Sequence, residues 1–148
     1  ARAGWGKHLV ATGYEHPAVL KPLQLLEKQE GFTLTLVKPG ADGRVKPEEL
    51  LAAVRADTAL VCAMQVNNET CAVLDVEALA AGVKQKNRRT AFHVDGVQGF
   101  CKILSVSLEK TQIDSYAVSG HKLHAPKGVG ALYLRRGMHI LPRFVGGG

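Results

Sequence analysis

The stretch TALVCAMQVNNE, residues 58–69, decides the fold. Its first nine residues form an almost continuous apolar run, and the polar residues Asn67, Asn68 and Glu69 follow directly. A strand with one solvated face alternates apolar and polar residues, whereas a continuous apolar run is typical of a strand covered on both faces. Such strands occur in parallel sheets with helices on each side. The stretch therefore predicts an α/β fold.

The segments around this strand alternate between strand and helix patterns. A helix is predicted over about 17–30, because Pro17 suits a first helical position and Gly31 suits a helix end. Strands that alternate with helices of 10 to 15 residues indicate a mostly parallel sheet with helices on both faces. The other predicted helices cover about 47–56 and 76–86, and the predicted strands cover 8–12, 32–37, 58–66, 90–95, 115–120 and 130–136.

The charge of the chain bears on its partners. The net charge is +6, and the cluster KQKNRR (84–89) resembles the solvated end of a helix, where cations interact favourably with the helix dipole. Only 5% of the residues are aromatic, so the pattern of a nucleic-acid-binding protein is absent and we expect no nucleic-acid partner. A basic pocket for an anionic small molecule is favoured instead. No apolar run approaches the ~18 residues of a membrane helix, so we expect no membrane partner.

Three cysteines, Cys62, Cys71 and Cys101, each lie in or beside an apolar stretch. An odd number in such surroundings predicts buried free thiols, as in a protein of the reducing cytoplasm.

Polar residues follow four of the predicted strands. Open α/β sheets bind ligands outside the carboxyl ends of their strands, so residues at these positions meet at one edge. Loop polarity and helix capping account for each residue singly, whereas a shared site accounts for all of them. The residues are Glu15–His16, Asn67–Glu69, Asp95 and Ser119–Lys122.

Three chemistries are weighed and ranked low for this edge. A metal site would draw on His121, His124, His93 and Asp95, but Pro126 and the following glycines make the H-x-x-H segment a loop, and no second carboxylate is in register. A phosphate-binding loop of the G-x-x-x-x-G-K-[ST] type is absent from the sequence. A Ser-His-Asp hydrolase is disfavoured because its candidate serine does not lie in a G-x-S-x-G elbow.

The remaining chemistry makes Lys122 a Schiff-base amine. Such a lysine must be partly desolvated, so that some free amine exists at neutral pH. A pyridoxal cofactor also requires an acidic partner for its ring nitrogen, a donor at its phenolic oxygen and donors for its phosphate. The candidates are Asp95 for the nitrogen, Gln98 for the phenolic oxygen, Ser119 and His121 for the phosphate, and His16 for the ring face.

At these residues the sequence resembles the class V aminotransferase family, and within it the NifS-type cysteine desulfurases. Five stretches match in order and with family-like spacing: EHPAVL (15–20), NNET (67–70), FHVDGVQ (92–98), SGHKLHAPKGVGALYLR (119–135) and the final GGG (146–148). The resemblance implies the large domain of fold-type I pyridoxal-phosphate enzymes. It also implies conversion of L-cysteine to L-alanine with transfer of the sulfur to an enzyme thiol, a homodimer, a cytoplasmic location, and a sulfur-acceptor protein of the kind used in iron–sulfur cluster assembly.

The resemblance also assigns roles to single residues. Lys122 would hold pyridoxal 5'-phosphate as a Schiff base, and Asp95 would pair with the pyridine nitrogen. His16 would stack on the ring and move protons, and Asn68 would lie near the cofactor oxygen and the substrate carboxylate. For Gln98, Ser119 and His121 the resemblance implies the same roles as those given above. The structural alternatives are a capping role for Asp95 or His16, a turn-shaping role for Asn67, a packed His93, a peripheral His124 and a surface Lys122.

The sequence departs from the family pattern at several points. Cys71 stands where these enzymes usually carry glycine, and Gln65 stands where many carry histidine. The family's first phosphate-binding loop, its small domain and the loop with the persulfide cysteine have no counterpart, so we expect residues 1–148 to be part of a large domain. The alternatives are a non-catalytic fragment, a binding module that keeps the fold, or another class V enzyme such as a selenocysteine lyase.

Overall fold

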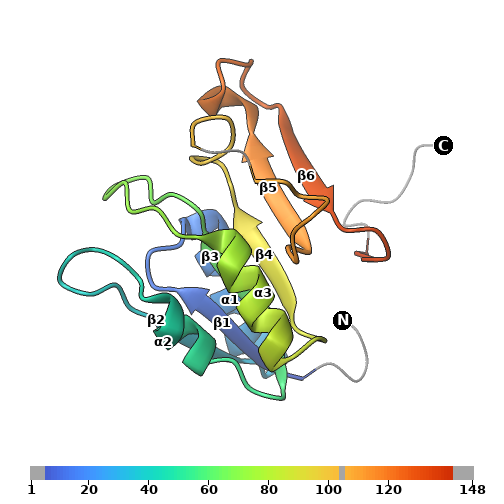
Figure 1. Ribbon diagram of the computed structural model, residues 1–148. Helices are drawn as coiled ribbons and strands as arrows, with labels where there is room; N and C mark the ends of the chain where they lie inside the picture. Colours follow the sequence, from blue (N-terminus) through green and yellow to red (C-terminus); the bar gives the residue numbers. More distant parts are fainter. Residues whose placement is uncertain (1–5, 104–105, 142–148) are drawn as a thin grey trace.

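The structure is a computed structural model that describes residues 6–103 and 106–141. The final glycines of the family resemblance lie outside these residues. The elements alternate as the sequence predicts (Figure 1). They are β1 (His8–Thr12), α1 (Pro17–Glu30), β2 (Thr33–Val37), α2 (Pro47–Ala52), β3 (Thr58–Met64), α3 (Val76–Lys86), β4 (Ala91–Asp95), β5 (Ser115–Ser119), a short 3-10 helix η1 (Gly120–Lys122) and β6 (Gly130–Leu134).

The described strands form one sheet in the order β2-β1-β3-β4-β5-β6. β1 to β5 are parallel, and β6 pairs antiparallel with β5. The chain moves from β1 outward to β2 and then returns to the other side of β1 to form β3. This reversal between β1 and β3 is the switch point at which doubly wound sheets bind their ligands.

Helices cover both faces of the sheet, as predicted. In Figure 1, α2 and α3 lie in front of the strands and α1 lies behind them. The α2–α3 side holds the larger core, which includes Val10, Leu50 and Leu79, while the α1 side buries Leu9 and Leu23. Leu9 and Val10 are neighbours on β1, so their opposite placement follows from the two-residue period of a strand. The continuous apolar runs are thereby explained, because both sets of side chains are covered.

The ends of a helix agree with the prediction where capping residues in the local sequence determine them. α1 begins at Pro17 behind the capping residue His16 and ends at Gly31, which adopts the left-handed conformation with φ 68°. α2 ends at Ala52, four residues before the predicted end. Asn87 Nδ2 binds the carbonyl oxygens of Arg55 and Ala56 at 3.1 and 3.0 Å. The last predicted turn of the helix does not form, because Arg55 N donates to Thr58 Oγ1 at 2.7 Å and not to a carbonyl oxygen one turn earlier.

The prediction of buried free thiols holds for one of the three cysteines. Cys62 lies on β3 and faces the α1 side of the sheet, where burial raises the pKa of its thiol well above the ordinary value. Cys71 and Cys101 are exposed, so for them the prediction is wrong. Both lie in turns with positive φ, at 58° and 59°, and these turns carry them out of the neighbouring apolar segments.

None of the helices in the described ranges combines the length and the apolar character that crossing a membrane requires.

Candidate functional site

Four turns gather at the edge of the sheet where β1, β3, β4 and β5 end. Because these strands are parallel, their carboxyl ends lie at the same edge. Met64 is aligned with Asp95, and Asp95 is aligned with Ala117 on β5. Ser119 is therefore two residues farther along β5, roughly 7 Å beyond the level of Asp95. The residues predicted to share a site thus lie at the ends of neighbouring strands.

The turn after β1 presents His16 and buries Glu15. His16 is exposed and caps α1, and its Nδ1 accepts a hydrogen bond from Ala18 N at 3.1 Å. Because Nδ1 accepts, the proton of the neutral ring is on Nε2. The capping role considered for His16 is confirmed, and it leaves Nε2 outside the helix as the nitrogen that can exchange a proton.

Glu15, one of the polar residues that follow the predicted strands, is a buried carboxyl for which no chemical role is predicted. It is 5% exposed, and its Oε1 accepts hydrogen bonds from Thr12 Oγ1 and from Met64 N, the latter at 2.6 Å. Its Oε2 has no partner among the described residues. Burial raises the pKa of Glu15 to about 7, the hydrogen bonds from Thr12 and Met64 oppose this, and the charge of Asp95 adds to it. In the sequence, the one indication that Glu15 is buried is its position between an apolar strand and a predicted site residue.

The raised pKa of Glu15 predicts that the contribution of this residue to the unfolding free energy falls as pH rises. A carboxyl whose pKa is about 7 in the folded chain and 4.5 in the unfolded chain holds more protons when folded, so its contribution is present below pH 4.5 and is lost as pH rises through 7. The difference amounts to roughly 3 kcal/mol. In Glu15→Gln this loss should be absent. Between pH 5 and pH 8 the unfolding free energy of the variant, measured with urea, should therefore rise by roughly 3 kcal/mol relative to that of the parent.

The comparison with the parent isolates Glu15 from other groups. His8 and His93 have pKa values lowered by burial, so they contribute to the pH dependence with the opposite sign, and they do so equally in both chains. A variant whose stability changes between pH 5 and 8 as much as that of the parent would contradict the prediction.

The turn after β3 is built around Asn67. This residue is 4% exposed, donates from Nδ2 to Tyr14 O at 3.0 Å and accepts at Oδ1 from Glu69 N and Thr70 N at 3.0 and 2.8 Å. The turn-shaping role considered for Asn67 is confirmed, and it also ties the turn after β3 to the turn after β1. Asn68 is exposed at the tip of this turn.

Asp95 ends β4 and is 5% exposed. Its Oδ1 accepts a hydrogen bond from Val97 N at 3.0 Å, which closes the turn after the strand. Among the described residues Oδ2 has no hydrogen-bond donor. Gln98 lies three residues on, is partly buried and accepts from Lys102 Nζ at 3.0 Å. Oδ2 does not belong to the buried side-chain atoms of the described residues that lack a partner, so a ligand at this edge of the sheet can reach it.

The turn after Asp95 packs closely on a buried pair beneath it. Tyr116 donates its hydroxyl to Gln65 Oε1, and burial raises the pKa of Tyr116 to about 12, so it remains a neutral donor. A Cβ at Gly96 would lie 1.9 Å from Tyr116 Cζ, and one at Gly99 would lie 2.3 Å from Gln65 Oε1. The two glycines therefore allow the turn to approach this pair. Gln65, a departure from the family pattern, belongs to the floor of the site.

The turn after β5 carries Ser119, His121 and Lys122. Ser119 Oγ and His121 Nδ1 are 2.8 Å apart. Gly120 N donates to Val129 O at 2.8 Å, which holds η1 against the start of β6. His121 and Lys122 are exposed. The expectation of a partly desolvated lysine is therefore wrong for the part of the chain that is described, because the turn projects beyond the sheet edge and no described segment covers it.

Two other histidines have structural places. His93 is partly buried on β4, and its Nδ1 is 2.8 Å from Ser115 Oγ, so the prediction of a packed strand residue is confirmed. His124 is exposed in the turn after η1 with φ 62°.

A cavity of about 470 Å³ lies beside the end of β3 and is lined by Gln65 and residues 73–77, but none of the predicted cofactor residues lines it.

The fold agrees with the comparisons to known proteins. The family model of class V aminotransferases matches residues 2–148, and the chain belongs to this family. A cysteine desulfurase of Nostoc sp. is 43% identical over 141 residues, which are 95% of this chain and 34% of the relative. A cysteine desulfurase IscS of Stutzerimonas stutzeri is 46% identical over 134 residues, or 90% of this chain and 32% of the relative. The chain thus spans about one third of the length of these relatives.

Solved structures give the same result for the fold. A NifS-like protein superimposes with a TM-score of 0.90 at 41% identity, covering 98% of this chain and 39% of the other. A structure described as SspA in complex with cysteine superimposes with a TM-score of 0.88 at 34% identity, covering 96% of this chain and 40% of the other. The predicted fold class, a mostly parallel sheet with helices on both faces like that of NifS-type enzymes, is confirmed.

Proposed function

We propose that the chain is part of the cofactor-binding domain of a pyridoxal-phosphate-dependent cysteine desulfurase. The identity of 43% and 46% to cysteine desulfurases supports this activity. The observation that carries the proposal is the carboxylate of Asp95, buried at the end of β4 with Oδ2 free of donors among the described residues. A protonated pyridine nitrogen would supply both the charge and the hydrogen bond that this oxygen lacks.

The donors at the same edge fit the other parts of the cofactor. Ser119 and His121, already 2.8 Å apart, would bind the phosphate oxygens, and Lys122 in the next position would bind the aldehyde carbon through its amine. Gln98 would donate from its amide nitrogen to the phenolic oxygen, because its Oε1 is occupied by Lys102. His16 would lie against the ring.

The cofactor, when bound, supplies an electron sink that stabilises negative charge on the α-carbon of an amino-acid substrate. Asp95 would keep the proton on the ring nitrogen and so maintain that capacity. Lys122 and His16 Nε2 would move protons at the substrate, and Asn68 would orient its carboxylate. In the overall reaction, L-cysteine and an enzyme thiol would yield L-alanine and an enzyme persulfide: the carbon–sulfur bond of cysteine would break, a carbon–hydrogen bond would replace it in alanine, and the sulfur would form a sulfur–sulfur bond with the enzyme thiol.

The proposal includes parts of the protein that lie outside residues 1–148. Residues 1–148 would form part of a large domain, and the other parts of the large domain, a small domain and the thiol that accepts sulfur would lie in protein outside this sequence. The exposed Lys122 supports this arrangement, because an imine-forming lysine requires a covered site. The complete protein would be a homodimer of the cytoplasm, where its thiols stay reduced, and would pass sulfur to an acceptor protein.

Of the two alternatives, one has a specific observation in its favour and the other has one against it. The exposure of Lys122 also favours a cofactor binder without turnover, because the described residues leave the amine in solvent. A selenocysteine lyase of the same family is disfavoured by the relative described in complex with cysteine.

Uptake of the cofactor tests the proposal directly. Pyridoxal phosphate added to the chain should give a visible absorbance band, and borohydride should remove the band and leave the cofactor mass on the peptide that contains Lys122. Cysteine added with a reductant should yield little or no sulfide from this chain alone. A chain that takes up no cofactor, or that is labelled on several surface lysines equally, would contradict the site assignment.

A further inference from the structure

A second cluster of charged groups lies at the opposite edge of the sheet. A cavity of about 340 Å³ is lined there by Lys84, Arg88, Arg89, Asp114, Arg135 and Arg136. These residues come from the last turn of α3, the turn before β4, the residue before β5 and the segment after β6. Because β6 is antiparallel, its carboxyl end lies beside the amino ends of β4 and β5. The cavity is therefore separated from the predicted cofactor site by the length of the sheet.

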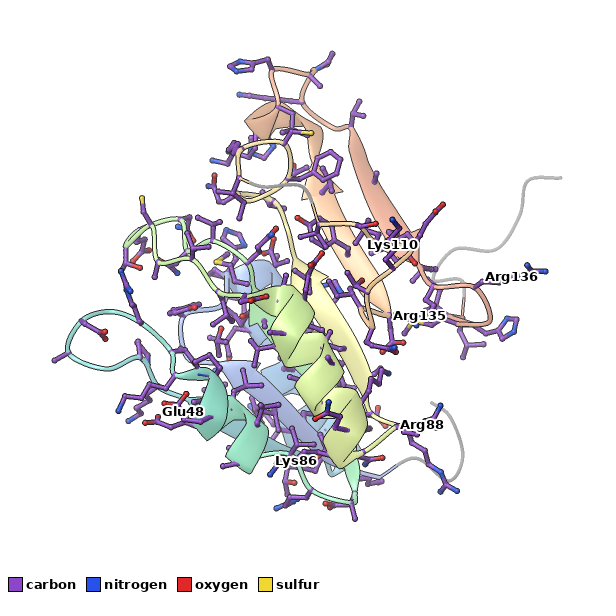
Figure 2. All side chains as sticks on the ribbon, viewed as in Figure 1. Glu48, Lys86, Arg88, Lys110, Arg135 and Arg136 are labelled. Atoms are coloured by element: carbon purple, nitrogen blue, oxygen red, sulfur yellow. The ribbon has the colours of Figure 1, made fainter. Side chains whose placement is uncertain are left out.

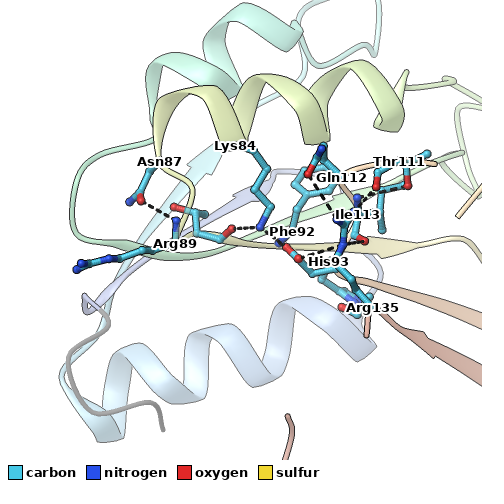
Figure 3. A network of polar contacts seen from close by, with 12 residues as sticks. Lys84, Asn87, Arg89, Phe92, His93, Thr111, Gln112, Ile113 and Arg135 are labelled. Carbon is cyan, nitrogen blue, oxygen red and sulfur yellow. Dashed lines mark hydrogen bonds and ion pairs between the residues drawn. The ribbon is translucent and has the colours of Figure 1, made fainter. Parts of the chain in front are cut away.

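The floor of this cavity is a fixed network of ions (Figure 3). Asp114 Oδ2 accepts from Lys84 Nζ at 2.5 Å and from Phe92 N at 2.8 Å, and Asp114 Oδ1 lies 3.6 Å from Arg135 Nε. Lys84 also donates to Thr90 O at 2.6 Å, and Arg135 Nε donates to Ile113 O at 3.1 Å. The side chains of Lys84, Asp114 and Arg135 are 17%, 13% and 32% exposed. Two cations are thus held in place around a single carboxylate.

The rim adds cations without adding carboxylates. Arg88, Arg89 and Arg136 are exposed, and none of them forms an ion pair with another described residue. Figure 2 shows Arg88, Arg135 and Arg136 along one side of the molecule. Five cationic side chains and one carboxylate line the cavity, which leaves four positive charges. The dipole of α3 offsets only about half a charge, and it does not account for the two arginines that follow β6.

The arginine side chains that line this cavity indicate the kind of ligand that it binds. The planar fork of arginine binds two oxygens of a phosphate at once, and several forks around one cavity suit a ligand with several oxyanion groups. The volume lies at the lower end of the range of small-molecule sites, about 300 to 1,000 Å³. We propose that this cavity binds a small molecule with two or more linked phosphate groups. The site is independent of the cofactor assigned above, because none of its residues belongs to that edge of the sheet.

Calorimetric titration of the chain with inorganic triphosphate, orthophosphate and sulfate tests this proposal. Triphosphate should bind with one equivalent and about tenfold or more tighter than either single anion, because its attraction grows with its charge. Affinity should fall as salt rises from roughly 0.02 to 0.15 M. Equal affinities for triphosphate and orthophosphate would overturn the proposal.

Two pairs of variants locate the binding. Arg88→Gln with Arg136→Gln should weaken triphosphate binding about tenfold or more, whereas Lys21→Gln with Arg44→Gln, which removes the same charge from exposed positions elsewhere, should change it less than about twofold. The first pair lies outside the ion network, so its far-UV circular dichroism and urea midpoint should match those of the parent. Equal weakening by both pairs would indicate diffuse attraction to a basic protein and would refute the site.

A third variant separates this cavity from the phosphate donors of the proposed function. Ser119→Ala should leave triphosphate affinity unchanged, and amide shifts on titration should appear at 88–91 and 136–138. Loss of binding in Ser119→Ala, or shifts confined to 119–123, would assign the triphosphate to the other edge of the sheet.

Discussion

The Lys122→Ala variant should form no covalent link with pyridoxal phosphate. Lys122 is the amine that follows the Ser119–His121 pair, so a cofactor held there by its phosphate presents its aldehyde to this side chain. Alanine has no nucleophile, so the visible band and the borohydride-stable label at this position should both be lost. Absorbance and peptide mass spectrometry measure the two effects.

Lys127→Ala is the matched control for this experiment. Lys127 is an exposed lysine five residues along the same loop, and no role is assigned to it. Its replacement should leave the band and the label at the level of the parent. A band that persists in Lys122→Ala, or one that disappears in both variants, would mean that the cofactor reacts with surface amines and not with this site.

The Asp114→Asn variant should lose roughly 3 to 5 kcal/mol of unfolding free energy, the cost of breaking a buried ion pair from one side. Lys84 and Arg135 both lie against this carboxylate and are mostly covered, so neither can replace the lost charge with full hydration. The asparagine oxygen can still accept from Phe92 N, so the loss reflects charge more than the backbone contact. Urea unfolding at pH 7 measures the difference.

Two further variants check the cause. Glu49→Gln removes an exposed partner of Lys46, at 3.4 Å, and should cost about 0.5 kcal/mol. Lys84→Met in the Asp114→Asn background should recover part of the loss, because it removes a cation left without its carboxylate. A cost below about 1 kcal/mol for Asp114→Asn would show that water reaches the network freely.

Much of the fold follows from periodicity in the sequence. The apolar runs at 58–64 and 91–95 are strands buried on both faces, and α1 and α3 match their predicted ranges because proline, glycine and charged residues mark their ends. The gathering of His16, Asp95 and Lys122 at one edge also follows, since parallel strands end on the same side. These features depend on local sequence and on one rule of sheet topology.

The parts that the sequence did not predict depend on contacts between distant segments. Lys84, interpreted as part of a solvated helix end, is mostly covered because Asp114, thirty residues later, pairs with it. Glu15 is buried because Met64 N binds its carboxylate across 49 residues. Cys71 is exposed because of the φ of its own turn. No local pattern reports which distant partner a charged side chain meets.

The order of the strands also bears on how quickly the two halves of the proposed site form. Each parallel pair among β1 to β5 needs a crossover before its strands can meet, whereas β5 and β6 are consecutive, are joined by residues 120–129 and pair antiparallel. When two segments distant in sequence pair, the loop between them must close, at a cost in entropy, before their contacts can form. Such pairs therefore form slowly. The loop with Lys122 belongs to the local hairpin, and Asp95 belongs to the crossover-dependent sheet. The lysine turn would therefore form early in folding, and its carboxylate partner would reach its place only when the parallel sheet closes.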